Sequence, residues 1–263
     1  MSPTFSFSNL FREILDNGAI NRLLKTLLPV SLRRWLQAQK WKLKVSAGVR
    51  LVPEEALTDR YREALLWLIN QELDGSLSLG DYLEFGVFNG TSLYCMHRAS
   101  QELGLERMRL FGFDSFEGLP DSAAIDGWIP GDFHIEYGYT RSWLTRRGVD
   151  WNRTFLVKGW FSETLTQALA REHKLKKASV IMIDCDAYQS TKEALTFCAS
   201  LIGQCAVIFF DDWNSGGRAD QRIGEKLAFE EFLHSNPDIT FDKFGGYNEK
   251  SFVVTIRRNG VQN

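Results

Sequence analysis

The 263-residue chain contains no long apolar run and no recognisable cysteine pattern. No stretch reaches the roughly 18–20 consecutive apolar residues that a membrane-spanning helix needs, so we expect no such span. Residues 1–7 lack a basic segment followed by an apolar block, and we therefore expect no secretory leader. The four cysteines show no Cys-x-x-Cys spacing, which argues against zinc and disulfide frameworks and favours reduced thiols in a cytoplasmic protein. For Cys185 we expect the role of a small buried side chain.

The chain also has no large excess of positive or of negative charge. The formal net charge is −2, so the composition gives no sign of the basic surface typical of nucleic-acid-binding proteins, and we expect no nucleic-acid partner. The charge is nevertheless uneven, because residues 1–50 hold nine Lys or Arg and only two acidic residues. We therefore divide the chain into a basic, amphipathic helical segment, residues 1–56, and a main domain, residues 57–263.

The basic segment has apolar residues at helical spacing between residues 8 and 45, followed by a predicted linker at 46–56. One interpretation is a helical cap or dimerisation element that packs on the main domain, and we expect a homo-oligomer. The other is peripheral contact with an anionic membrane at its inner face, because Trp35 and Trp41 are flanked by basic residues. These basic residues are Arg33, Arg34, Lys40, Lys42 and Lys44.

A regular alternation of strand and helix patterns begins at residue 81. Short apolar runs predict buried strands at 82–85, 109–114, 154–157, 179–184 and 205–211. Helices are predicted at 91–103, 162–174, 190–202 and 220–235, after an earlier one that Thr58 or Asp59 would cap. Two final runs, 239–244 and 251–256, are joined by a Gly-Gly turn and predict an antiparallel hairpin. The fold class is therefore α/β, with a Rossmann-like, mostly parallel sheet and a C-terminal hairpin.

The connection between the second and third strands, residues 115–152, is too long to be a simple loop. Its aromatic and histidine residues are Phe116, Trp128, Phe133, His134, Tyr137, Tyr139, Trp143 and Trp151. This density predicts a lid or the wall of an acceptor site, while packing of the loop onto the domain is an alternative that is compatible with it. His134 is either an acceptor contact or second base, or a packing residue.

Acidic residues follow two of the predicted strands. Asp184 and Asp186 end the fourth strand, and Asp211 and Asp212 end the fifth. The carboxyl ends of parallel strands border the ligand crevice of an open α/β sheet. Carboxylates gathered there repel one another unless they are protonated or bound to a cation. The pattern predicts a divalent metal site in an active-site cleft.

Three further motifs surround the same strand ends. Glu84, Gly86 and Gly90 lie in the turn from the first strand into a helix, where the glycines allow close approach to a ligand. A carboxylate in this turn would repel a pyrophosphate but can hold an amino or sulfonium group. Asp114 ends the second strand, where an acid can bind ribose hydroxyls, or cap a helix or turn. Gly159 is followed by two rings, Trp160 and Phe161, that either stack on a base or pack in the core.

Together these motifs resemble one known family. Glu-Phe-Gly-Val-Phe-x-Gly, Phe-Asp-Ser-Phe-Glu-Gly-Leu-Pro, Lys-Gly-Trp-Phe-x-x-Thr-Leu, Ile-Asp-x-Asp-x-Tyr-x-Ser-Thr and Phe-Asp-Asp-Trp occur in this order between residues 80 and 215. The chain is similar here to the macrocin O-methyltransferases, which are metal-dependent sugar O-methyltransferases of the class I fold that use S-adenosylmethionine. Ala187 stands where that family usually has Leu, and the stretch from Arg222 to Leu233 is unlike that of the antibiotic-sugar enzymes.

The resemblance implies a function and a set of site residues. Asp184, Asp211 and Asp212 would hold Mg²⁺, Asp184 would also be the general base, and Asp186 would orient a ligand or a water molecule. The donor, S-adenosylmethionine, would be held by the residues of the first three motifs, namely Glu84, Phe85, Gly86, Val87, Gly90, Ser92, Asp114, Ser115, Gly159 and Trp160. The acceptor would be a carbohydrate-containing small molecule or a lipid-linked glycan.

Two alternatives remain open at this stage. Asp184-Cys-Asp186 is also the Asp-x-Asp signature with which many glycosyltransferases bind a metal–nucleotide diphosphate, although Glu84 and the separate pair of acids argue against it. The second alternative is a non-catalytic scaffold on a methyltransferase fold, which the presence of every required acid disfavours.

Overall fold

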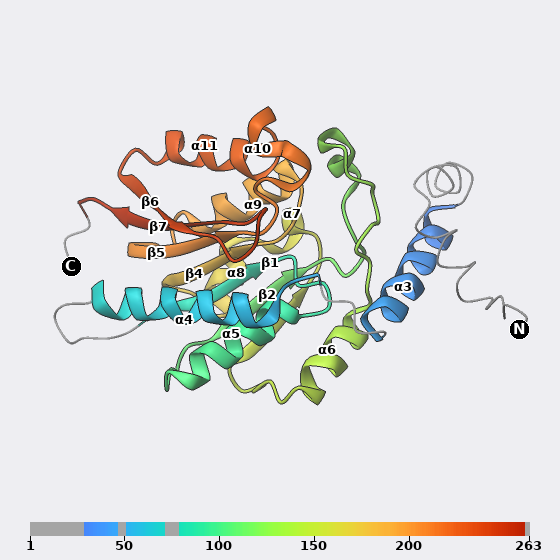
Figure 1. The fold of residues 1–263 in the computed structure, drawn as a ribbon, viewed down its shortest axis with the longest axis horizontal. Helices are drawn as coiled ribbons and strands as arrows, with labels where there is room; N and C mark the ends of the chain where they lie inside the picture. The colour runs from blue at the N-terminus through green and yellow to red at the C-terminus, as the bar shows by residue number, and fades with distance from the viewer. Residues whose placement is uncertain (1–28, 47–50, 72–78, 261–263) are drawn as a thin grey trace, which may run out of the picture.

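The computed structural model describes residues 29–46, 51–71 and 79–260 (Figure 1). Within these residues seven strands form one sheet in the order β3-β2-β1-β4-β5-β7-β6. The strands are β1 (Asp81–Phe85), β2 (Leu110–Asp114), β3 (Thr154–Lys158), β4 (Ala178–Ile183), β5 (Ile202–Phe210), β6 (Ile239–Gly245) and β7 (Phe252–Arg258). Strands β1 to β5 are parallel, and β7 pairs antiparallel with both β5 and β6. The predicted parallel sheet with its C-terminal hairpin is confirmed.

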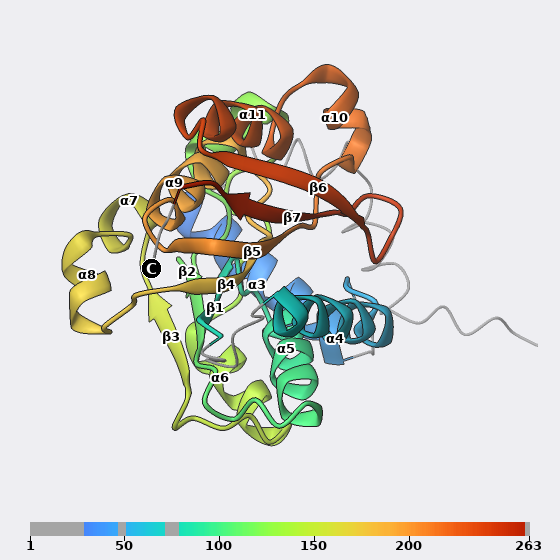
Figure 2. The same cartoon turned by 90° about the vertical axis from the view of Figure 1, so that its left-hand side faces the viewer.

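Helices cover both faces of this sheet (Figure 2). They are α3 (Val30–Ser46), α4 (Glu54–Gln71), α5 (Thr91–Glu102), α6 (Tyr137–Arg146), α7 (Phe161–Thr164), α8 (Gln167–Glu172), α9 (Tyr188–Cys198), α10 (Arg218–Gln221) and α11 (Glu225–Ser235), with 3₁₀ turns η1 (Asp121–Asp126) and η2 (Ser215–Gly217). Side chains alternate between the faces of each strand, so Tyr82 packs with the α4 and α5 side and its neighbour Leu83 with the α9 and α11 side.

The register of the central strands decides where the site lies. Phe85 of β1 is paired with Ile183 of β4, and Ile183 is paired with Phe210 of β5. These three neighbouring strands therefore end at one level. The residues that come next in the chain, Gly86 and the two acids that follow β4 and β5, are brought side by side at the carboxyl edge of the sheet.

Some predicted helix boundaries are corrected by the structure. The helix expected at 162–174 is two short helices, α7 and α8, and the hydroxyl of Thr166 caps the second by accepting from the N–H of Leu169 at 3.2 Å. Helix α4 begins at Glu54 rather than at Thr58, whose hydroxyl instead donates to the Glu54 carbonyl inside the helix. The predicted linker thus ends before residue 54, and α4 runs across the boundary expected between residues 56 and 57.

The N-terminal segment is described only from residue 29. The apolar stripes predicted between residues 8 and 28 lie outside the described residues, whereas the third predicted helix is α3. None of the helices among the described residues has the length and apolar character of a membrane span. The four cysteines, all of them in described positions, are buried and make no disulfide.

Candidate functional site

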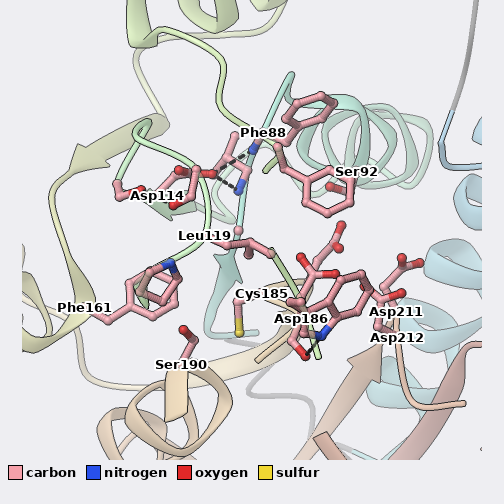
Figure 3. Close-up of a pocket in the computed structure, with 18 of the residues that line it drawn as sticks. Phe88, Ser92, Asp114, Leu119, Phe161, Cys185, Asp186, Ser190, Asp211 and Asp212 are labelled. Atoms are coloured by element: carbon pink, nitrogen blue, oxygen red, sulfur yellow. Dashed lines mark hydrogen bonds between the residues drawn. The ribbon is translucent and has the colours of Figure 1, made fainter. Parts of the chain in front are cut away.

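A cavity of about 570 Å³ opens at the carboxyl edge of the sheet. Its wall includes residues at the carboxyl ends of β1, β2, β4 and β5, among them Gly86, Asp114 and Asp184. Figure 3 shows Asp114 on one side of the cavity and Asp211 and Asp212 on the other. The size is within the range of roughly 300–1,000 Å³ that small-molecule sites occupy. The cavity therefore lies at the edge where the sequence predicts the ligand crevice.

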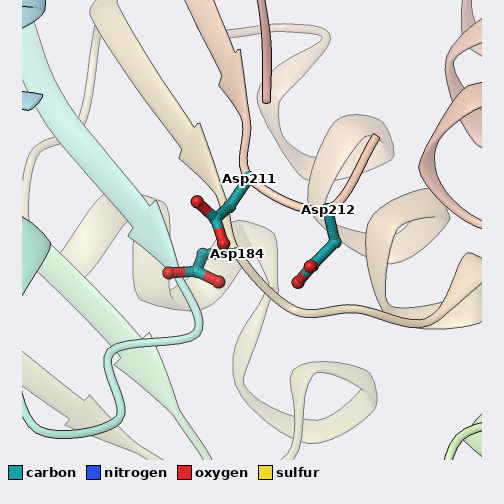
Figure 4. A group of neighbouring side chains, drawn as sticks. All are labelled: Asp184, Asp211 and Asp212. Carbon is teal, nitrogen blue, oxygen red and sulfur yellow. The ribbon is translucent and has the colours of Figure 1, made fainter. Parts of the chain in front are cut away.

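Three carboxylates meet at one side of this cavity. One oxygen from each of Asp184, Asp211 and Asp212 lies within 4.8 Å of the other two (Figure 4). The backbone holds them there, because the N–H of Asp184 donates to the Phe85 carbonyl at 2.9 Å and that of Asp211 donates to the Ile183 carbonyl at 3.0 Å. The structure thus brings together the three acids that the sequence predicts as metal ligands.

The turn after β1 approaches these acids closely. Gly86 has φ +93°, and a Cβ atom at this position would lie 1.8 Å from the carbonyl oxygen of Asp184. The N–H groups of Val87 and Phe88 both donate to Oδ2 of Asp114 at 2.8 Å. The turn is therefore fixed on one side by β4 and on the other by the acid that ends β2.

The loop between β6 and β7 contributes residues that the sequence analysis missed. Nζ of Lys250 lies 2.7 Å from Oδ2 of Asp211 and 2.7 Å from Oδ1 of Asp212. The Tyr247 hydroxyl donates to Oδ1 of Asp211, and Asn248 contacts the same oxygen at 3.5 Å. No local pattern marks these residues, because a hairpin loop with Asn, Lys and Gly is also what an ordinary turn contains.

Comparison with known families classifies the chain. The model described as Macrocin-O-methyltransferase (TylF) matches residues 56–226, which is more than half of the chain. The chain belongs to the macrocin O-methyltransferase family.

Two curated relatives are O-methyltransferases by name, and the name of the first includes a rhamnosyl group. The 8-demethyl-8-(2,3-dimethoxy-alpha-L-rhamnosyl)-tetracenomycin-C 4'-O-methyltransferase of Streptomyces olivaceus is 29% identical over 143 residues, which cover 51% of this chain and 53% of the enzyme. The demethyldecarbamoylnovobiocin O-methyltransferase of Streptomyces niveus is 24% identical over 192 residues, which cover 69% of this chain and 70% of the enzyme. The match thus spans about half the length of the first relative.

Solved structures share the fold. The O-methyltransferase NovP matches 78% of this chain and 80% of its own, with a TM-score of 0.61 at 19% identity. The calicheamicin methyltransferase CalS11 matches 93% and 94%, with a TM-score of 0.57 at 21% identity. An O-methyltransferase from Bacillus cereus, solved in complex with SAH, matches 91% and 97%, with a TM-score of 0.54 at 15% identity. The class I methyltransferase fold predicted for this member of the family is confirmed.

The electrostatics of the three acids are those of a cation site. Burial raises the pKa of Asp184 well above its ordinary value, and the charges of Asp211 and Asp212 raise it further. Burial alone would lower the pKa of Lys250, but Asp212 and Asp211 raise it, so this ammonium stays charged. Without a cation, the repulsion among the three acids is relieved by Lys250 and by the protonation that the raised pKa of Asp184 favours. Their hard oxygen atoms are the kind of ligand that a divalent cation such as Mg²⁺ prefers.

Asp186 occupies a strained position beside the cluster. It has φ +64°, which is uncommon for a residue with a Cβ atom, and its side chain is buried. Its carbonyl accepts from Nε1 of Trp128 at 3.0 Å, and its carboxyl group is hydrogen-bonded to that of Asp212. Burial and the charge of Asp212 raise the pKa of Asp186 well above its ordinary value. Strain of this kind is concentrated at functional sites.

Glu84, which the sequence analysis assigned to the donor, lies outside the cavity wall in this structure. Glu84 is fully buried beneath the turn, where its carboxylate accepts from the Tyr82 hydroxyl and from the Ser92 hydroxyl, both at 2.6 Å. Burial raises its pKa to about 8, although both hydrogen bonds act in the opposite direction. Glu84 therefore ties β1 to α5 and does not form part of the cavity wall.

The other residues expected at the donor fall into two groups. Gly86, Val87, Ser92, Asp114, Ser115 and Trp160 line the cavity, whereas Phe85, Gly90 and Gly159 do not. The Phe85 ring instead stacks on Phe113 in the core, and Gly90 is the N-cap of α5 with φ +86°. Phe161, the second ring of the motif that begins at Gly159, also lines the cavity, as do Ser162 and Ser190.

Asp114 makes the turn-capping contacts that the sequence analysis gave as the alternative to ribose binding. Its Oδ2 accepts from two backbone N–H groups, and its Oδ1 accepts from the N–H of Phe116 at 2.6 Å. A carboxylate offers about four acceptor positions, so roughly one remains for a ligand. Asp114 lines the cavity, but in this conformation it can receive one ribose hydroxyl rather than two.

The long aromatic connection both packs and lines the cavity. Trp128 and Phe133 form part of the wall, together with Phe88. Trp41 of α3 stacks on Phe133 at 5.4 Å and meets the edge of Phe88 at 5.2 Å, so the N-terminal helix supports this aromatic wall from behind. His134 is buried and does not line the cavity, in agreement with a packing role.

Proposed function

We propose that this family member transfers a methyl group from S-adenosylmethionine to a hydroxyl group of a sugar, glycan or glycosylated metabolite, with Mg²⁺ bound by Asp184, Asp211 and Asp212. The observation that carries the proposal is the juxtaposition of these three acids with the glycine turn of β1 in one cavity. Membership of the macrocin O-methyltransferase family and the names of the two curated relatives support the same reaction.

The donor would bind along the edge of β1 and β2. The wall there combines Gly86, which leaves the backbone of the turn accessible, with Asp114 and the ring of Trp160. Asp114 would accept one ribose hydroxyl, because its other acceptor positions are used by the backbone. Since the turn abuts Asp184, a donor bound in this way would lie next to the acid cluster.

The acceptor would bind between the acids and the aromatic wall. When bound to the three acids, a divalent cation supplies Lewis-acid polarisation of an acceptor hydroxyl, which lowers the pKa of that hydroxyl and orients it. Asp184 lines the cavity and would take the hydroxyl proton on its carboxylate while the oxygen attacks the methyl group in line. Phe88, Trp128 and Phe133 would pack against the sugar and exclude water, which favours the combination of oppositely charged reactants.

Two binding measurements and one labelling experiment test this proposal. In isothermal titration calorimetry, S-adenosylhomocysteine should bind and UDP-sugars should not, which separates a methyltransferase from a glycosyltransferase. Cells that express the protein with isotopically labelled methionine should then yield labelled methyl groups on a glycan or glycosylated metabolite, detected by mass spectrometry. Binding of UDP-sugars with no binding of the methyltransferase ligand would overturn the assignment.

A further inference from the structure

Glu225 is a buried acid with no hydrogen-bonding partner. It is the first residue of α11, follows Gly224, which has φ +63° and ψ −136°, and is only 2% exposed. Neither oxygen of its carboxyl group makes a hydrogen bond of ordinary geometry in the described structure, although the nearby backbone N–H of Asp212 acts to lower its pKa. The motifs used in the sequence analysis do not include Glu225.

The position of Glu225 in its helix does not explain its burial. Acids in the first turn of a helix are usually stabilised by hydrogen bonds to backbone N–H groups or by exposure to water. The end of α11 has no such side-chain cap, and the carboxyl group is out of contact with solvent. Burying a polar group without a partner costs about 1–3 kcal/mol in proteins, and more when it is charged. The fold therefore retains an unfavourable group here.

The carboxyl group of Glu225 lies near enough to the acid cluster to be affected by its charges. Its pKa is raised well above the ordinary value, first by burial and then by the charges of Asp212, Asp211 and Asp184. In turn, its charge raises the pKa of Cys185, a residue of the cavity wall. Glu225 itself does not line the cavity. It thus acts on the cluster from the side of α11, whereas Lys250 contacts the cluster from the hairpin loop.

We infer that Glu225 is a fourth carboxylate of the cation site, which strengthens the binding of the divalent cation from behind Asp212. The inference rests on the proposed metal dependence of the reaction. Three carboxylates leave part of the six-oxygen shell of Mg²⁺ to water and substrate, and a further carboxylate that faces the ligands orients them and adds negative charge. A bound cation also supplies the compensation that Glu225 lacks, which accounts for its retention in the fold.

Calorimetric titration of the full chain with Mg²⁺ or Mn²⁺, without donor or acceptor, tests the inference. We expect Glu225→Gln to weaken cation binding by about tenfold or more, since residues that support metal ligands typically contribute this much. Glu230→Gln is the matched control, because Glu230 lies on the same helix and pairs with Arg222 at 3.1 Å near the surface. The control should bind the cation as the natural chain does.

A second readout separates a metal role from a merely structural one. With EDTA present, Glu225→Gln should melt at a higher temperature than the natural chain, because the amide cannot carry the negative charge that burial, Asp212 and Asp211 oppose. Added Mg²⁺ should reduce or reverse this difference. Should Gln disturb folding, as circular dichroism would show, Glu225→Ala takes its place in both measurements.

The possible outcomes are distinct. Unchanged cation affinity in Glu225→Gln, together with the higher melting temperature, would mean that Glu225 is only a buried neutral acid, and the inference would fail while the proposed reaction stood. If the natural chain binds neither cation, the proposed metal dependence fails and the inference fails with it. Weaker binding in Glu225→Gln but not in Glu230→Gln supports the inference.

Discussion

The carbonyl oxygen of Asp184 occupies the space in which any side chain at residue 86 would begin. A Cβ atom on Gly86 would lie 1.8 Å from that oxygen, and Gly86 also has a φ of +93°. This contact joins the donor-side turn of β1 to the first acid of the cation site. A change at the turn must therefore be transmitted to the acid.

Gly86→Ala should impair both stability and methyl transfer. The backbone of residue 184 has to move, so we expect a loss of unfolding free energy on the order of 2 kcal/mol or more and weaker cation binding. Gly104→Ala is the control: its φ is +68°, but nothing lies within 4 Å of the added Cβ atom, so only the strain of about 1–2 kcal/mol applies. Urea unfolding and calorimetry make the comparison. Equal losses of unfolding free energy and of cation affinity in the two variants would contradict the coupling between the β1 turn and Asp184.

Lys250→Met should tighten the binding of Mg²⁺ and destabilise the metal-free protein. The ammonium group bonds to Asp211 and Asp212 at 2.7 Å, so it competes with a cation and also relieves their repulsion. Its side chain is 37% exposed, so it can move into solvent when the cation binds. We expect a several-fold gain in affinity by calorimetry and a lower melting temperature in EDTA. The control is Lys243→Met, at an exposed position of β6. Weaker cation binding in Lys250→Met would instead mean that the main role of Lys250 is to hold the loop between β6 and β7 against the acids.

Asp184→Asn should abolish methyl transfer while leaving donor binding largely intact. The substitution would remove the proposed general base, which is also a proposed metal ligand, and general bases alone contribute typically 10²–10⁴-fold to a rate. The donor-binding wall is formed mainly by residues that follow β1, β2 and β3, so binding of S-adenosylhomocysteine should change little in calorimetry. Asp121→Asn, at the exposed start of η1, serves as the control. If Asp184→Asn retains full activity on every acceptor that the natural chain methylates, the assigned mechanism is wrong.

The raised pKa of Glu84 predicts that the folded protein loses stability as the pH rises. Its pKa is raised from 4.5 to about 8 in the folded protein, so the folded chain binds a proton that the unfolded chain has released. The stabilisation that this proton provides is fully present below about pH 4.5 and is lost as the pH rises through 8, with a total of about 5 kcal/mol. The difference in unfolding free energy between the natural chain and Glu84→Gln, measured from pH 5 to 8.5, isolates this term. A difference that does not vary with pH would exclude it.

The exposed face of α3 tests the membrane interpretation of the N-terminal segment. Leu32, Trp35 and Leu43 are 41%, 55% and 65% exposed, although the opposite face of α3 packs on the domain through Ala38 and Val45. We expect sedimentation with anionic vesicles to be reduced by Trp35→Ser and absent with neutral vesicles. Absence of binding with or without residues 1–50 would leave only the role of a helical cap or dimerisation element. The expected homo-oligomer stays a prediction for analytical ultracentrifugation.

The sequence was sufficient for the strands and for the three acids at their ends. Each strand is a short apolar run, and the residue after such a run is placed by the sheet itself, so Asp184 and Asp211 could be located without coordinates. The partners of a side chain were less predictable. Nothing local shows that Glu84 bonds to Tyr82 and Ser92, because that contact depends on how α5 packs on β1.

The residues that the sequence analysis missed share a physical cause. Lys250 and Glu225 reach the acids from a hairpin loop and from a helix that lie 38 and 13 residues beyond Asp212 in the chain. Their proximity is created by the antiparallel return of β7 beside β5 and by the packing of α11, and neither leaves a periodic signal near the acids. Motif matching identified the members of the cation site that lie on consecutive strand ends, and only those.

The common level at which β1, β4 and β5 end has a consequence for how such a protein can change. An inserted or deleted residue in any of these strands would displace its acid or turn by about 3.3 Å and reverse the side to which it points. The aromatic connection and the N-terminal helix are attached outside this frame, so they can be lengthened, exchanged or reshaped without moving the acids. Acceptor preference is thus open to variation in this architecture, whereas the position of the reaction centre is fixed by strand length.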